Sequence, residues 1–150
     1  DVCSSDLKEI TTEGGLNLFK NKHKIKKFIF EFKKNQVRTS LFINANLKDV
    51  KLSKDLGADC IELHTGKLSN LIKNKKNFLV ELNKIKKCCK YASTLNLEVH
   101  AGHGLDYKTT KLLSKISSIK EFNIGHFIIG ESIVYGIKNI IKKFRKISNN

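Results

Sequence analysis

The histidines of this 150-residue chain gather in a few short stretches. Four of the five lie in three segments that also carry glycine and, in two cases, a carboxyl or amide side chain. The segments are Glu62-Leu63-His64-Thr65-Gly66, His100-Ala101-Gly102-His103-Gly104 and Asn123-Ile124-Gly125-His126. An imidazole gives and takes a proton near neutral pH. The clustering therefore predicts a site for proton transfer or for phosphate binding.

Each of these residues also has a purely structural interpretation. Glu62 lies between Ile61 and Leu63, so it could be a buried acid with a satisfied partner. A single histidine is more often a satisfied polar residue than a catalyst, although a cluster at strand ends favours function. Gly102 and Gly104 either let a ligand approach the backbone closely or shape a tight turn.

A zinc site is a weaker alternative. His100 and His103 could be two ligands, with Glu62 as the third. Residues three apart in a strand point to opposite faces, so the three side chains would meet only if the loop bent early. We therefore expect no metal.

Alternating short strands and helices would position these segments. Strands are expected at 38–44, 60–66, 97–104 and 121–127, and helices at 20–35, 46–57, 78–92, from residue 106 and from about residue 130. This order indicates parallel βαβ units, and neither G-x-G-x-x-G nor a P-loop is present to favour a nucleotide-binding doubly wound fold.

A (β/α)8 barrel needs about 250 residues, so we expect an α/β fold in which about four βα units form the C-terminal half of a TIM barrel. In such barrels the reactive residues lie at the carboxyl ends of the strands, which is where the three segments end.

Composition narrows the class of protein further. The chain has 29 Lys+Arg against 14 Asp+Glu, a net charge of +15. Only Arg38 and Arg145 are arginine and the lysines are spread along helical stretches, so we interpret them as solvated surface rather than as a nucleic-acid site. No apolar run approaches about 20 residues, which argues against a membrane helix. Four scattered cysteines suggest a reducing, cytoplasmic compartment.

Five motifs, in this order, closely resemble the pyridoxine 5′-phosphate synthase family. They are ITTEGGL (10–16), SLFI (40–43), GAD-x-IELHTG (57–66), AGHGL (101–105) and NIGH-x-IIG (123–130). Members of that family are barrels that close the pyridine ring of vitamin B6. The resemblance covers roughly residues 8–148, and the combination is far more specific than any one motif.

The resemblance implies a reaction. 3-Amino-2-oxopropyl phosphate condenses with 1-deoxy-D-xylulose 5-phosphate, giving pyridoxine 5′-phosphate, inorganic phosphate and water, with no metal or organic cofactor. It also implies a homo-oligomer for the whole enzyme, and the composition argues against a nucleic-acid or membrane partner.

The resemblance also implies roles for particular residues. His103 matches the proton donor, Glu62 the acid that stabilises transition states, and Thr11 a contact to the deoxyxylulose phosphate. The contacts to the aminoketone phosphate match Gly104, Gly125 and His126.

The departures from the family are informative. Four features of the family's first three strands have no counterpart here: an Asn-x-Asp-His motif, a histidine that acts as a base, a nearby arginine and a catalytic glutamate. His100 stands where many members have asparagine.

We expect residues 1–7, which match none of the family's motifs, to be translated adapter sequence or a divergent terminus. We expect residues 8–150 to be a partial barrel domain. Two other functions stay open: a non-catalytic phosphate-binding or assembly half-barrel, and a basic nucleic-acid-binding protein.

Overall fold

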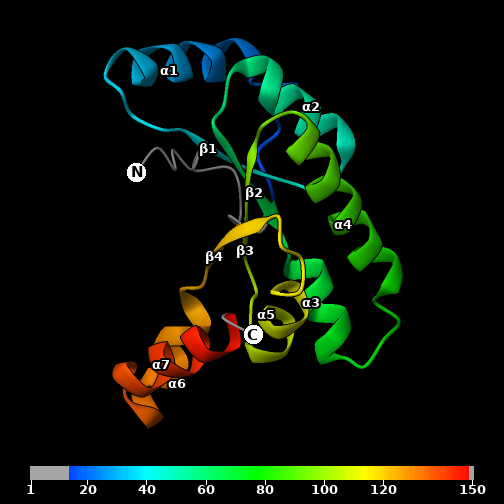
Figure 1. Ribbon diagram of the computed structural model, residues 1–150, viewed down its shortest axis with the longest axis vertical. Helices are drawn as coiled ribbons and strands as arrows, with labels where there is room; N and C mark the ends of the chain where they lie inside the picture. The colour runs from blue at the N-terminus through cyan, green and yellow to red at the C-terminus, as the bar shows by residue number, and fades with distance from the viewer. Residues whose placement is uncertain (1–13, 149–150) are drawn as a thin grey trace.

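The computed structural model describes residues 14–148, which contain a four-stranded parallel sheet with helices along one side (Figure 1). The strands stand side by side in sequence order. They are β1 (Ser40–Ile43), β2 (Cys60–His64), β3 (Glu98–Gly102) and β4 (Ile119–Asn123). Thr11 and the expected leader at 1–7 lie outside the described residues.

Helices connect and follow the strands, as parallel neighbours require. They are α1 (Lys22–Lys34), α2 (Leu47–Leu56), α3 (Gly66–Lys73), α4 (Leu79–Thr94), α5 (Tyr107–Leu113), α6 (His126–Tyr135) and α7 (Ile137–Ser148). The prediction of four parallel βα units is confirmed. None of the helices in the described part of the chain is long and apolar enough to cross a membrane.

Short-range hydrogen bonds explain where two of the helices begin. The side chain of Asn46 accepts a hydrogen bond of 2.8 Å from the Asp49 N–H at the start of α2, and Asp106 accepts one of 2.7 Å from the Thr109 N–H at the start of α5. Gly57 ends α2 with a φ of 92°, a conformation that glycine adopts without a steric penalty. These three boundaries agree with the sequence prediction.

Four other features differ from the prediction. The last strand ends at Asn123 rather than at 127, and the following helix begins at His126 rather than near Gly130. The apolar residues after Gly125 continue as a helix, because a short apolar run suits either structure. Gly136, with a φ of 77°, divides the final helical segment into α6 and α7. The turn after β2 forms a separate helix, α3, ahead of α4.

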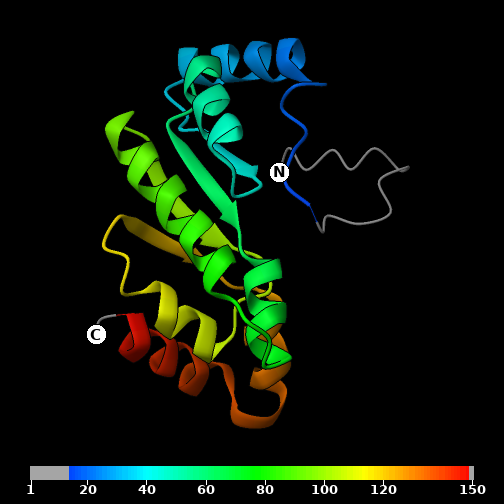
Figure 2. The same ribbon diagram turned by 90° about the vertical axis from the view of Figure 1, so that its right-hand side faces the viewer.

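The two faces of the sheet have opposite character. One face packs beneath helices, which Figure 2 shows in front of the strands. Its side chains are aliphatic and buried: Leu41, Ile43, Ile61, Leu63, Val99 and Ala101. Burying these groups between sheet and helices is the main source of stability in this layer.

The other face of the sheet is polar. Phe42, Glu62, His100 and Glu121 lie opposite one another in register, one from each strand. No helix of the described part covers this face (Figure 1), and the Glu121 side chain is 58% exposed. In a closed barrel, this face of the strands turns toward the axis.

The edges of the sheet are only partly covered. The Leu16 N–H donates a hydrogen bond of 2.8 Å to the Phe42 carbonyl, so the segment at 15–16 runs beside the end of β1. Within residues 14–148, no strand pairs with the outer edge of β4. Such edges leave backbone groups available for further strands.

Candidate active site

The segments that carry the sequence-predicted residues within 14–148 lie toward the carboxyl edge of the sheet. Glu62 lies in the middle of β2, His103 directly follows β3, and Gly125 precedes α6 after β4. Parallel register brings the end of β3 beside the end of β4, because Gly102 pairs with Asn123. The three segments thus converge although 64 and 123 are far apart in sequence.

Glu62 is held by a residue that the sequence analysis did not assign. The Asn123 side-chain amide donates a hydrogen bond of 2.7 Å to the Glu62 carboxylate. Burial raises the pKa of Glu62 above its ordinary value, while the bond from Asn123 and the charges of His100 and His103 oppose that rise. A carboxyl group with a raised pKa can hold and release a proton nearer to neutral pH.

Gly102 makes room for this carboxylate. A Cβ atom at Gly102 would lie 1.7 Å from Glu62 Oε1, so any larger residue would displace the acid. The glycine therefore accommodates a side chain of the neighbouring strand. Asn123 lies in a segment rich in polar residues, but its bond to Glu62 depends on the strand register that places Gly102 opposite it, which the sequence does not show.

His103 belongs to a cluster of three rings. Its imidazole stacks on that of His64, with ring centroids 4.5 Å apart and an interplanar angle of 22°. The Phe42 ring lies 5.4 Å from His64 and 6.4 Å from His103. A Cβ atom at Gly66 would lie 2.6 Å from His103 Cδ2 and 2.8 Å from His64 Cε1, so this glycine also leaves space for the rings.

The residues expected to contact phosphate lie in two loops at the same edge. Gly104 has a φ of 72°, in the left-handed region. Gly125 is the N-cap of α6 and His126 its first residue, and both are exposed. The first N–H groups of a helix have no acceptor within the helix, and the positive end of the helix dipole favours an anion there.

A different group of possible metal ligands lies toward the amino ends of the strands. Within residues 14–148, one trio places its ligand atoms within 4.8 Å of one another: Cys60, Glu98 and His100. The Arg38 guanidinium already contacts two of them, 2.8 Å from Cys60 Sγ and 3.0 Å from Glu98 Oε1. Burial also raises the pKa of the Cys60 thiol. This cluster is an ion-pair network around an arginine, and it does not include His103.

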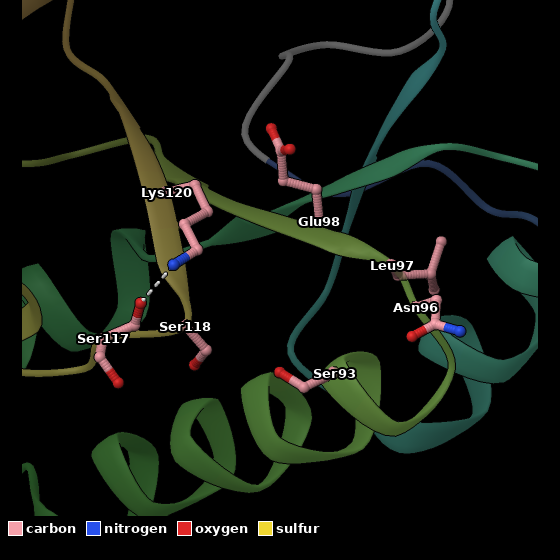
Figure 3. Close-up of a pocket in the computed structure, with 7 residues that line it drawn as sticks. All are labelled: Ser93, Asn96, Leu97, Glu98, Ser117, Ser118 and Lys120. Carbon is pink, nitrogen blue, oxygen red and sulfur yellow. Dashed lines mark hydrogen bonds between the residues drawn. The ribbon is translucent and has the colours of Figure 1, made fainter.

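A pocket of about 440 Å³ lies at the end of the sheet opposite the candidate site (Figure 3). Its lining residues come from the end of α4 and the starts of β3 and β4: Ser93, Asn96, Leu97, Glu98, Ser117, Ser118 and Lys120. The Lys120 ammonium group donates to the Ser117 carbonyl at 3.1 Å. In barrels this end of the strands usually serves stability rather than catalysis.

Parallel βα units with ionisable groups at the carboxyl ends of the strands are typical of (β/α)8-barrel enzymes. The family model "Pyridoxal phosphate biosynthesis protein PdxJ" matches residues 4–150. The chain belongs to this family.

Relatives named pyridoxine 5′-phosphate synthase match nearly the whole chain. The one from Pelagibacter ubique (strain HTCC1062) is 63% identical over 142 residues, which are 95% of this chain and 59% of the relative. Those from Sulfurihydrogenibium sp. (strain YO3AOP1) and Prochlorococcus marinus (strain MIT 9211) are 42% and 38% identical, with 95% and 99% of this chain and 58% and 60% of the relatives covered. The chain thus spans about three-fifths of the length of the relatives that it matches.

Proposed function

We propose that the protein carrying this chain is a pyridoxine 5′-phosphate synthase, which condenses 3-amino-2-oxopropyl phosphate with 1-deoxy-D-xylulose 5-phosphate. The observation that carries the proposal is the placement of Glu62 and His103 at one edge of the sheet, in a chain 63% identical to a protein of that name. Pyridoxine 5′-phosphate, inorganic phosphate and water are the products.

In this proposal His103 and Glu62 handle protons. Ring closure needs imine formation, dehydration and proton shifts, and each step is helped by a group that exchanges protons near pH 7. His103 donates a proton to a departing oxygen. Glu62, whose pKa is raised by burial, stabilises the transition states that develop beside it.

The phosphate groups of the substrates would be held mainly by backbone. Gly104, Gly125 and His126 offer N–H groups to the phosphate of the aminoketone, and glycine lets that phosphate approach the chain closely. The beginning of α6 at His126 supports this role, because it places Gly125 at the N-cap and His126 in the first turn, where N–H groups have no acceptor within the helix. Thr11 would contact the deoxyxylulose phosphate.

We expect the whole protein to be a cytoplasmic homo-oligomer of closed barrels. The family's remaining catalytic groups have no counterpart in this chain. Because residues that act as a unit cannot be partly removed, the 150-residue chain alone is expected to be inactive.

The test is a hybrid barrel, in which this chain replaces the matching 142 residues of the Pelagibacter ubique synthase. Purified hybrid is given both substrates, and pyridoxine 5′-phosphate and released phosphate are measured. We expect turnover, and we expect His103→Ala to reduce kcat by about 10²–10⁴-fold. The unmodified Pelagibacter protein is the positive control. A folded hybrid without turnover, or full turnover by His103→Ala, would contradict the proposal.

A further inference from the structure

Thr65, the residue that follows β2, is completely buried and does not cap its own helix. It occupies the N-cap of α3, where a threonine hydroxyl commonly accepts a hydrogen bond from an N–H two or three residues ahead. No such bond forms. Instead Thr65 Oγ1 lies 2.8 Å from the carbonyl oxygens of both Gly102 and His103, so the hydroxyl can donate to either carbonyl.

The backbone of Thr65 makes the same connection. Its N–H donates a hydrogen bond of 2.8 Å to the Gly102 carbonyl. One residue therefore ties the turn after β2 to the end of β3 by its main chain and its side chain together. Removing the hydroxyl would take its donor away from the part-buried His103 carbonyl, whereas the Gly102 carbonyl would keep the bond from the Thr65 N–H.

His103, whose carbonyl lies within hydrogen-bond distance of Thr65, has an uncommon backbone conformation. His103 has a φ of 69°, and Gly104 after it has a φ of 72°. The left-handed region is unusual for residues other than glycine, and such residues persist where their surroundings hold them. The hydrogen bond from Thr65 acts on the carbonyl of this same residue.

The neighbours of Thr65 act on the ring of His103. His64 stacks against the imidazole, and Gly66 leaves the space that both rings occupy. Residues 64–66 thus form a continuous support for one side chain of the candidate site.

We propose that Thr65 is a positioning residue for His103: its hydroxyl holds the His103 backbone in the left-handed conformation that lays the imidazole on His64. The expected effect of Thr65 on turnover rests on the proposed function, whereas its expected effect on the position of the His103 imidazole does not.

The experiment compares Thr65→Val with Thr65→Ser in the hybrid barrel. Valine keeps the shape without the donor, and serine keeps the donor. A small displacement of a reacting group can cost up to about 10²-fold, so we expect Thr65→Val to lower kcat about tenfold to 10²-fold. KM should change less than kcat, because the imidazole acts in the chemical steps whereas Gly104, which follows His103, is one of three proposed backbone contacts to the phosphate. Thr65→Ser should restore most of the activity.

Thr110→Val is the matched control. Thr110 is 1% exposed, and its hydroxyl has no hydrogen-bond partner within the described residues, so the same substitution removes no bond there. We expect its kcat and melting temperature to be close to those of the parent. If Thr65→Val does not fold, Thr65→Ala against Thr65→Ser makes the same comparison.

The second measurement follows the ring itself by NMR of protein labelled in its histidines, with His103→Ala used to assign the His103 signals. Thr65→Val should shift the His103 ring signals as the stack with His64 is lost, and Thr65→Ser should not. An inactive parent hybrid would refute the proposed function, and the ring signals would still decide the role of Thr65. The proposal would be overturned if Thr65→Val left both the His103 ring signals and kcat unchanged. It would also be overturned if Thr65→Ser and Thr110→Val lost as much kcat as Thr65→Val does.

Discussion

The Asn123 side chain at the end of β4 donates a hydrogen bond of 2.7 Å to Glu62 in β2, 61 residues earlier in the chain. The bond crosses β3, the strand between them, and it is possible because the intervening position is Gly102. The carboxylate is thus fixed by one strand and given space by another.

Loss of this bond should be visible in the titration of Glu62. Because the bond lowers the pKa of Glu62 against the rise caused by burial, Asn123→Ala should raise that pKa further. The limb of the pH–rate profile that depends on Glu62 should move to higher pH in the hybrid barrel. Asn139→Ala, which removes an amide bonded to the Tyr135 carbonyl in another helix, is the control and should leave the profile unchanged.

Gly102→Ala should separate folding from activity. The added Cβ would overlap the end of the Glu62 side chain, which can swing aside, so the fold should survive while the carboxylate leaves Asn123. We expect kcat to fall about tenfold or more with a small change in melting temperature.

Gly130→Ala is the comparison for that variant. Nothing lies within 4 Å of a Cβ at this position in α6, and alanine favours a helix over glycine by about 0.5–1 kcal/mol. It should keep activity and gain slight stability. Equal activity in the two alanine variants would show that Gly102 is not needed for the acid.

Glu62→Gln should make the hybrid more stable at neutral pH. Since the folded state raises the pKa of Glu62 above its ordinary 4.5, it binds this proton more tightly than the unfolded state does. The resulting stabilisation is complete below the unfolded pKa and is lost as the pH rises through the folded pKa. Glutamine does not ionise and can still accept from Asn123.

Melting temperatures measured across pH check this prediction. The difference in favour of Glu62→Gln should be smallest below pH 4.5 and grow toward neutral pH. A difference that is independent of pH, or that grows as the pH falls, would contradict the direction of the Glu62 shift.

The described cysteines should be unreactive in the folded protein. Burial raises the pKa values of Cys88 and Cys89 to about 11, and it also raises the pKa of Cys60. The thiolate is the reactive form, and at pH 8 only about one such thiol in a thousand would be ionised at a pKa of 11. A disulfide reagent should label none of them in a Cys3→Ser hybrid at that pH, and all of them in guanidinium. Rapid labelling of the native protein would contradict their burial.

Much of the fold followed from the sequence because its signals are local. Each of three helix ends was predicted, because it depends on residues only a few positions apart. They are the N-caps at Asn46 and Asp106 and the C-cap at Gly57, which has a left-handed conformation. The end of β4 was misplaced because Ile124 and Phe127 fit a strand as well as a helix. Tertiary packing decides between strand and helix for such a segment, and a short stretch of sequence carries no information about that packing.

The candidate site was predictable in part for the same reason. Glu62 and His103 lie in segments whose composition is unusual on its own. The partners Asn123 and Thr65 could not be assigned, because their roles depend on contacts across 61 and 38 residues. Their residue types are common at strand ends and helix caps, so only the register between strands reveals what they bind.

The polar face of the sheet has a consequence for whatever covers it. Although the chain carries a net charge of +15, this face presents three carboxylates, those of Glu62, Glu98 and Glu121. Arg38 and His100 contact Glu98, and Asn123 bonds to Glu62, whereas Glu121 has His100 only at 4.0 Å among the described residues. Covering an unpaired carboxylate with apolar groups costs roughly several kcal/mol. A sheet that closes over these strands must therefore bring cations or hydrogen-bond donors to meet them. The strands that complete such a barrel would therefore have to match this face in charge as well as in shape. Added strands with acidic side chains facing the barrel axis would repel these carboxylates and disfavour closure.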